Sequence, residues 1–132
     1  MLLIKNIKKN YAPLQINPRR IVSLHKFHAK KTEVDGIKFP SRLEARVYCQ
    51  LKLLRKSNLF LFFLRQIPFD LPGPSKHFVD FCVFYKNGVK FIEAKGRDLP
   101  VGRLKRKQAE DLYQINIAVI KNIKQLNEIL FS

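Results

Sequence analysis

The sequence predicts one domain with a mixed α/β (α+β) fold, in which helices cover both faces of a central four-stranded sheet. Residues 40–56 repeat apolar side chains at helical spacing, and residues 77–95 contain two strand-like runs on either side of an Asn-Gly pair. The chain has 132 residues, 46% of them hydrophobic, which is enough for one core and too few for two.

The chain begins with a basic segment that is only weakly periodic. Pro13, Pro18 and the turn-like sequence VDGI at 34–37 interrupt residues 1–39. We expect these residues to form a basic N-terminal extension with at most short strands. Residues 40–132 are expected to form the main domain.

The first helix is predicted directly after this extension. Apolar side chains recur every three or four positions, at Leu43, Val47, Leu51 and Leu54. Ser41, followed by Glu44 three residues later, has the spacing of a capping box at the start of a helix.

Three strands are expected next. Residues 58–71, NLFLFFLRQIPFDL, carry enough Phe, Leu and Ile to form a strand that is buried on both faces. A second strand is expected at 77–85 and a third at 89–95, because Asn-Gly between two apolar runs is typical of a hairpin turn. A basic helix in RLKRKQAEDLY, a fourth strand in INIAVI and an amphipathic helix in KNIKQLNEILF complete the chain.

The hairpin places ionic side chains within apolar strands. If Asn87 and Gly88 are the turn residues, paired positions sum to 175, and Asp80 lies opposite Lys95. Because alternate residues share a face, Asp80, Glu93 and Lys95 then project from the same face, with the two carboxylate residues about 7 to 8 Å apart. Such a pair can converge on one hard cation. A cross-strand salt bridge between Asp80 and Lys95 remains the alternative.

The opposite face of the same hairpin is apolar throughout. It carries Phe81, Val83, Ile92 and Ala94. A sheet whose strands are this apolar needs cover on both faces, and for this reason we expect helices on each side.

The charge balance points to a polyanionic partner. There are 26 Lys and Arg residues against 10 Asp and Glu, a formal net charge of +16. Such an excess favours nucleic acid, because each neutralised phosphate releases counterions. The basic residues recur from Lys5 to Lys124, which indicates a broad positive surface rather than one arm. A ribosomal-type binding protein, or charge that serves solubility alone, is the alternative on this evidence.

Several other classes of protein are disfavoured. The two cysteines have no motif spacing, and no segment has the length and apolarity of a signal peptide or a membrane span. There is no Gly-rich phosphate loop. We therefore expect a cytoplasmic protein with no membrane partner and no nucleotide cofactor.

An acidic residue on one strand, followed by Glu-x-Lys on the next, resembles the signature of the PD-(D/E)XK nuclease superfamily. Here the signature is VD at 79–80 and EAK at 93–95. The sequences KKTEVDGIKFPSRLEARVYCQLKLL and FVDFCVFYKNGVKFIEAKG resemble a group of small phage-borne proteins related to Holliday-junction resolvases. The resemblance covers about residues 30–115. Val79 departs from the signature, which has proline there.

The resemblance implies a restriction-endonuclease-like core in α-β-β-β-α-β order. It implies that Asp80 and Glu93 bind Mg²⁺ or Mn²⁺, that the carbonyl of Ala94 adds a ligand, and that Lys95 orients the attacking water. Glu44 matches an extra acid that faces the site in many members, and Gln66 matches a polar position near it. The alternatives are that Glu44 only completes the capping box and that Gln66 is a polar residue of an edge strand.

DNA contacts are expected from basic residues after the third strand and in the extension. These are Arg97, Arg103, Lys105, Arg106, Lys107, Lys30 and Lys31. A solvated helix face is the alternative for those in the basic helix. The sequence thus predicts a Mg²⁺-dependent endonuclease that acts on branched or structured DNA, as a homodimer because one such site cuts one strand. A nicking, mismatch or homing-type endonuclease on the same fold, or a basic nucleic-acid-binding protein that does not cleave, remains open.

Overall fold

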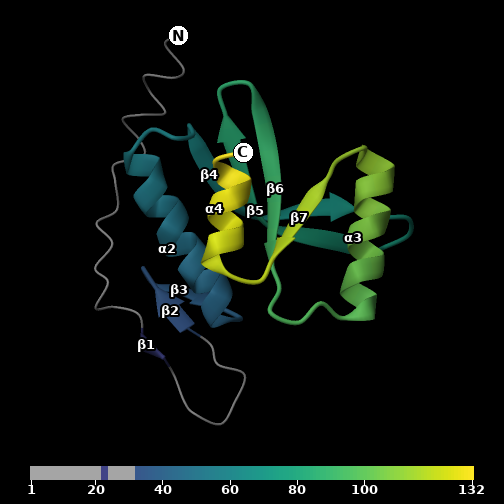
Figure 1. The fold of residues 1–132 in the computed structure, drawn as a ribbon. Coiled ribbons are helices and arrows are strands. Elements are labelled where there is room, and N and C mark those ends of the chain that lie inside the picture. The colour runs from purple at the N-terminus through teal and green to yellow at the C-terminus, as the bar shows by residue number, and fades with distance from the viewer. Residues whose placement is uncertain (1–21, 24–31) are drawn as a thin grey trace.

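The computed structural model describes residues 22–23 and 32–132, which form two β-sheets and three helices (Figure 1). In chain order the elements are β1 (Val22–Ser23), β2 (Thr32–Val34), β3 (Ile37–Phe39), α2 (Arg42–Lys56), β4 (Phe62–Asp70), β5 (Lys76–Tyr85), β6 (Gly88–Ala94), α3 (Pro100–Tyr113), β7 (Ile117–Ile120) and α4 (Ile123–Leu130). The predicted mixed class is confirmed.

The small sheet, with strand order β1-β2-β3, comes from the predicted extension. Its β2–β3 hairpin turns at Asp35 and Gly36, which both have positive φ. Val34 and Phe39 are buried in the same core as α2, so this hairpin packs onto the main domain. Residues 1–21 and 24–31, including the predicted DNA contacts Lys30 and Lys31, lie outside the described residues.

Helix α2 forms where the sequence predicts it. The side chain of Ser41, the N-cap residue, accepts a hydrogen bond from the backbone N–H of Glu44 at 3.1 Å. This bond satisfies one of the free donors of the first turn. The helix then buries one face, including Val47, Tyr48 and Leu51, against the sheet.

The large sheet has the order β4-β5-β6-β7, with three antiparallel strands and β7 parallel to β6. The prediction that β4 is buried on both faces is wrong. Strand β4 lies at an edge of the sheet and alternates between half-buried and exposed side chains, with Leu64 38% exposed. The high content of apolar residues in this segment did not indicate whether the strand lies at the edge or in the middle of the sheet.

The predicted register of the β5–β6 hairpin is also wrong, by two residues. Phe81 pairs with Ile92 and Tyr85 pairs with Gly88, so paired positions sum to 173 (81 + 92) and Asp80 does not face Lys95. Neither Gly88 nor the residue before it is among the described residues with positive φ, so the Asn-Gly preference that fixed the predicted turn does not apply. A shift of two residues leaves side-chain alternation unchanged.

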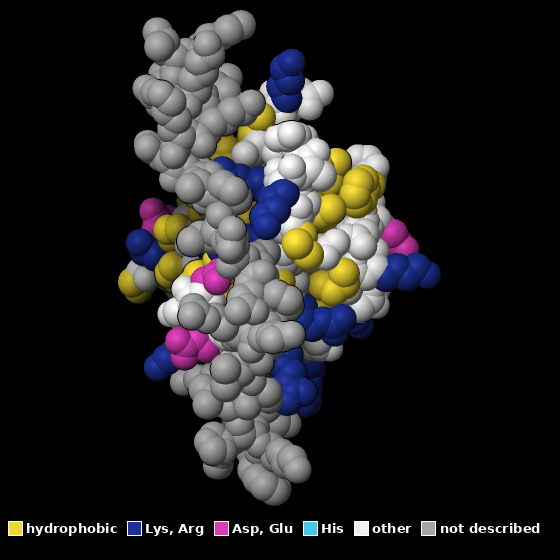
Figure 2. Space-filling model, turned by 90° about the vertical axis from the view of Figure 1, so that its left-hand side faces the viewer, with side chains coloured by type: hydrophobic (Ala, Val, Ile, Leu, Met, Phe, Trp, Pro, Cys, Tyr) yellow, Lys and Arg dark blue, Asp and Glu magenta, His cyan; other side chains and the backbone are white. Residues whose placement is uncertain are grey.

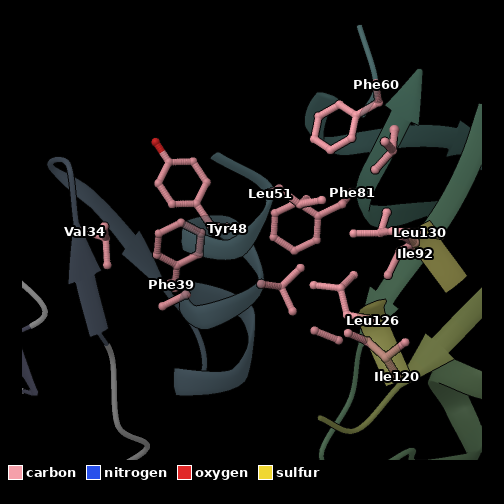
Figure 3. Close-up of a cluster of buried hydrophobic side chains, with 14 residues drawn as sticks. Val34, Phe39, Tyr48, Leu51, Phe60, Phe81, Ile92, Ile120, Leu126 and Leu130 are labelled. Atoms are coloured by element: carbon pink, nitrogen blue, oxygen red, sulfur yellow. The ribbon is translucent and has the colours of Figure 1, made fainter. Parts of the chain in front are cut away.

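Two clusters of buried side chains lie on opposite faces of the large sheet. The first lies between the sheet, α2 and α4, and it contains the four apolar residues predicted to share a face (Figure 3). In the second, Ala109 of α3 packs against β5 and β7. Figure 1 shows α2 and α4 on one side of the sheet and α3 on the other, which confirms helices on both faces. Among the described helices, none combines the length and apolarity required to cross a bilayer.

Leu51→Ala should destabilise the protein by about 2 to 5 kcal/mol, because Leu51 is fully buried between α2 and the sheet and its truncation leaves a cavity. Leu53→Ala is the matched control on the same helix, since Leu53 is 53% exposed. Its effect should stay within about 0.5 kcal/mol. Urea denaturation of the two variants measures the difference. Equal losses of stability would contradict the placement of the core on this face of α2.

Candidate active site

The pairing between β4 and β5 is interrupted at one position. The residues on either side of Gln66 pair with β5, whereas Gln66 itself, opposite Asp80, does not pair and has φ 51°. This left-handed backbone costs a non-glycine residue about 1 kcal/mol or more. Val79 and Phe81, which a regular strand would place on one face, belong to clusters on opposite faces. Asp80 therefore lies at a distortion of the sheet.

The carboxylate of Asp80 fills the gap where the ladder between β5 and β6 ends. The last residue of β6 that pairs with β5 is Ile92, and Asp80 Oδ2 accepts a hydrogen bond from the N–H of Ala94 at 3.0 Å. The next N–H, of Lys95, donates to β7. Because N–H and C=O of one strand residue point to the same side, the carbonyl of Ala94 faces the same gap as Asp80.

Gln66 joins two buried carboxyl groups across this gap. Its Nε2 donates to Glu44 Oε1 at 2.9 Å and to Asp80 Oδ1 at 3.2 Å. Glu44 is 2% exposed and Asp80 is 5% exposed. Burial, and then repulsion by Asp80, raise the pKa of Glu44 to about 7. The structure thus brings Glu44, Gln66 and Asp80 together, as the site interpretation expects, although Glu44 also lies in the first turn capped by Ser41 and Gln66 lies on the edge strand β4.

Lys95 is the partly exposed member of this group. Its Nζ lies 3.8 Å from Asp80 Oδ2, and its side chain is 39% exposed. The ion pair between Asp80 and Lys95, which the sequence offered as an alternative, is therefore present, although the two residues are not directly opposite. The partly exposed side chain of Lys95 is therefore accessible to a ligand that binds beside the two buried carboxyl groups.

The third residue of the predicted trio, Glu93, has other partners. Its carboxylate contacts His77 Nε2 and accepts a hydrogen bond from Arg106 Nη1 at 3.1 Å, and the residue is fully buried. Arg106 also donates to both carboxylate oxygens of Asp98, at 3.0 and 2.5 Å. The predicted trio is thus divided between two polar clusters: Asp80 and Lys95 lie in one, and Glu93 lies in the other.

This placement corrects the prediction that Arg106 binds DNA. Arg106 is 7% exposed, and its guanidinium group is bound to Glu93 and Asp98. The sequence analysis missed His77, Asp98 and the role of Arg106. One signal was available for Arg106: Ala109 marks the face of α3 that packs on the sheet, and Arg106 lies three residues earlier on the same face.

The other predicted DNA contacts in this region remain accessible. Arg97 is exposed, Lys105 is half-buried, and the side chains of Arg103 and Lys107 are 64% and 73% exposed. On the face that carries α2, Figure 2 shows Lys and Arg side chains distributed from top to bottom rather than in one cluster. The accessible cations therefore provide a broad basic surface.

The residues of the gap suit a hard divalent cation. Carboxylate and carbonyl oxygens are the ligands that Mg²⁺ and Mn²⁺ prefer, and Glu44, Asp80 and Ala94 offer them beside one another. The raised pKa of Glu44 reflects first its burial and then the neighbouring carboxyl group of Asp80, and a bound cation would offset the second of these effects. Within the described residues, no group of three or more His, Cys, Asp or Glu side chains is placed to hold a metal ion.

Comparison with known proteins gives one family. A family described as a protein of unknown function (DUF1064) matches residues 24–127. No curated protein and no solved structure matches the chain.

Glu44→Gln should remove a pH dependence of stability. The pKa of Glu44 is about 7 in the folded protein against an ordinary value of 4.5, so the folded chain retains this proton and wild-type stability falls as pH rises between these values. The variant should lack this fall and be more stable than wild type by about 1 to 3 kcal/mol at about pH 8. Urea denaturation with a chelator, from about pH 5 to about pH 8, measures this.

Glu128→Gln, an exposed substitution on α4, controls for the loss of one carboxylate elsewhere. Parallel pH profiles for wild type and Glu44→Gln would contradict the buried carboxyl pair.

Arg106→Met should destabilise the protein by about 3 to 5 kcal/mol, because it leaves the buried carboxylate of Glu93 without its arginine. Arg103→Met, on an exposed position of the same helix, should cost less than about 1 kcal/mol. The double variant Glu93→Gln/Arg106→Met should recover part of the loss, since no buried charge is then uncompensated. Urea denaturation distinguishes these cases, and equal effects of the two arginine substitutions would disprove the buried network.

Proposed function

The chain belongs to the DUF1064 family, and we propose that it is a metal-dependent DNA endonuclease with a restriction-endonuclease-like core. One observation carries the proposal: Gln66 joins the buried carboxyl groups of Glu44 and Asp80 at a break in the sheet, with the ammonium group of Lys95 beside them. The order of elements from α2 to β7 is α-β-β-β-α-β, as the superfamily resemblance implies.

The residues of the gap would hold Mg²⁺ or Mn²⁺ through the carboxylates of Glu44 and Asp80 and the carbonyl of Ala94. When bound, such an ion supplies a Lewis acid and a water molecule of lowered pKa. Gln66 orients both carboxyl groups by donating to each of them. Lys95 donates to a phosphate oxygen and stabilises the negative charge that develops there.

Glu93 has a conditional role in this proposal. Its carboxylate is held by Arg106 and His77 on the side of the sheet that α3 covers. Glu93 contributes a metal ligand only when its carboxylate exchanges Arg106 for the ion. While Glu93 remains bound to Arg106, the proposed metal ligands are the carboxylates of Asp80 and Glu44 and the carbonyl of Ala94.

The substrate that fits best is branched or otherwise structured DNA. The net charge of +16 and the exposed side chains of Arg97, Arg103 and Lys107 support binding to a phosphate backbone. The resemblance to resolvase-like proteins supports a branched substrate, on which symmetric cleavage of two strands requires two sites and therefore a homodimer. A nicking, mismatch or homing-type enzyme on the same core would cut a duplex instead, and a panel of junction, duplex and mismatched DNA separates these cases.

A second candidate function is DNA binding without cleavage. The burial of Glu93 against Arg106 favours it, because one carboxylate of the superfamily signature is already neutralised by the protein. Salt-dependent binding by the wild type, with no cleavage of any DNA in the panel under Mg²⁺ or Mn²⁺, would select this candidate.

Asp80→Asn and Lys95→Met should each lower metal-dependent cleavage of a four-way junction by at least about a hundredfold, because each removes a group that contacts the ion or the phosphate. Asn is chosen because its side-chain oxygen can still accept the hydrogen bond from Ala94. Binding, measured by fluorescence anisotropy with a chelator present, should change by less than about threefold in Asp80→Asn. Lys95→Met removes one phosphate contact and should weaken binding by no more than about tenfold. Gel analysis of the products measures cleavage.

The matched control is Asp70→Asn, because the Asp70 side chain on β4 is 78% exposed. It should leave cleavage unchanged. Wild-type cleavage rates in Asp80→Asn would refute the proposed site, whereas a joint loss of binding and cleavage with a lowered melting temperature would indicate damaged folding. Glu93→Gln determines whether Glu93 joins the ion set, since only a ligand role predicts a comparable loss of cleavage.

A further inference from the structure

Arg65 on β4 is held by two aromatic rings next to the candidate site. Its guanidinium carbon lies 4.5 Å from the ring centroid of Phe39 and 5.8 Å from that of Tyr48. These two rings lie 5.1 Å apart and pack against each other in the core (Figure 3). A guanidinium group stacked on aromatic rings is restricted in position, so it loses little further freedom when it binds a ligand.

No carboxylate of the described residues lies at ion-pair distance from this guanidinium group. Among the described residues it forms no ion pair, and its buried Nε has no hydrogen-bond acceptor. A buried donor without an acceptor is costly and uncommon. Arg106, the buried arginine on the other side of the sheet, is bound to two carboxylates. Arg65 therefore differs from Arg106 in that no carboxylate of the described residues lies at ion-pair distance from its guanidinium group.

Neutralisation of Glu44 does not by itself explain why an arginine is placed at position 65. The charge of Arg65 lowers the pKa of Glu44, but burial and Asp80 outweigh this effect and leave that pKa at about 7. Glu44 receives its hydrogen bond from Gln66, the residue after Arg65. Arg65 is therefore near the carboxyl pair, while its terminal nitrogens form no hydrogen bond or ion pair with the described residues.

We propose that Arg65 binds a backbone phosphate of nucleic acid next to the carboxyl pair formed by Glu44 and Asp80. A guanidinium group presents parallel N–H donors that match the oxygens of a phosphodiester, and it attracts no cation. Arg65 then positions the strand so that the neighbouring phosphate lies beside Lys95. The inference rests on the proposed function for its ligand, nucleic acid, and not on cleavage.

The first test measures the salt dependence of binding. Full-length wild type, Arg65→Gln and Arg65→Lys are titrated against a four-way junction by fluorescence anisotropy, with a chelator present to prevent cleavage. Loss of one phosphate contact should lower the slope of log K against log salt by about 1 and weaken binding about tenfold at physiological salt. Arg65→Lys should keep the slope and weaken binding less, because it keeps the charge but not the planar group.

Lys124→Gln removes one exposed positive charge from α4 and serves as the control. It should weaken binding less than about twofold if only net charge is affected. Thermal unfolding of each variant checks folding. If Arg65→Gln does not fold, Arg65→Lys carries the test through its affinity and through the phosphate scan below.

The second test locates the contact. Single methylphosphonate substitutions neutralise one phosphate of the junction at a time. Several of these substitutions should weaken binding by the wild type. The substitution at the phosphate that Arg65 contacts should not affect binding by Arg65→Gln and should affect Arg65→Lys less than wild type, because these variants have already lost or weakened that contact. The assignment would be overturned if every methylphosphonate substitution weakened binding by both variants as much as it weakens binding by wild type, and if the salt slope of Arg65→Gln equalled that of wild type. Absence of DNA binding by wild type would instead reject the proposed function.

Discussion

The break in pairing between β5 and β6 is the constraint on which the candidate site depends. Beyond Ile92 the backbone of β6 no longer meets β5, and an interior N–H without an acceptor would be costly. The carboxylate of Asp80 accepts from Ala94 and so replaces a strand partner with an ionisable side chain. One oxygen of that carboxylate is thereby fixed by the sheet, and the other faces Gln66 and, through it, Glu44.

The buried charges divide into groups that neutralise one another and groups that do not. Glu93, Arg106 and Asp98 form a closed network between β6 and α3, and such networks support packing. On the other side, Glu44 and Asp80 are buried next to each other with the partly exposed Lys95 as the ion-pair partner of Asp80, and Arg65 forms no ion pair among the described residues. A buried carboxyl group with a strongly raised pKa, close to a lysine and an arginine, is typical of functional sites, and it supports the proposed binding of a cation and a phosphate here.

Local sequence patterns predicted the helices and strands, whereas contacts between residues distant in the sequence determine the geometry of the candidate site. The cap at Ser41 and the apolar faces of α2 and of the β5–β6 hairpin follow from periodicities of 3.6 and 2, so the helices on both faces were predictable. The register was not, because the turn does not use the left-handed backbone that Asn-Gly favours. The left-handed Gln66 and the contact between Glu93 and Arg106 depend on tertiary packing across 13 residues or more. Helical spacing from Ala109 could indicate that Arg106 faces the sheet, but no local pattern identifies Glu93 as its partner.

Two successive residues of β6, Glu93 and Ala94, present groups in three directions, and this limits what Glu93 can do. The backbone of Ala94 faces Asp80, its side chain packs in the first core, and Glu93 extends to α3. If Glu93 left Arg106, the arginine would not be stranded, because Asp98 already accepts from both of its terminal nitrogens. The cost would fall mainly on the contact with His77. Glu93 can therefore release Arg106 and bind a divalent ion without leaving the arginine of α3 unpaired, because Arg106 keeps its ion pair with Asp98.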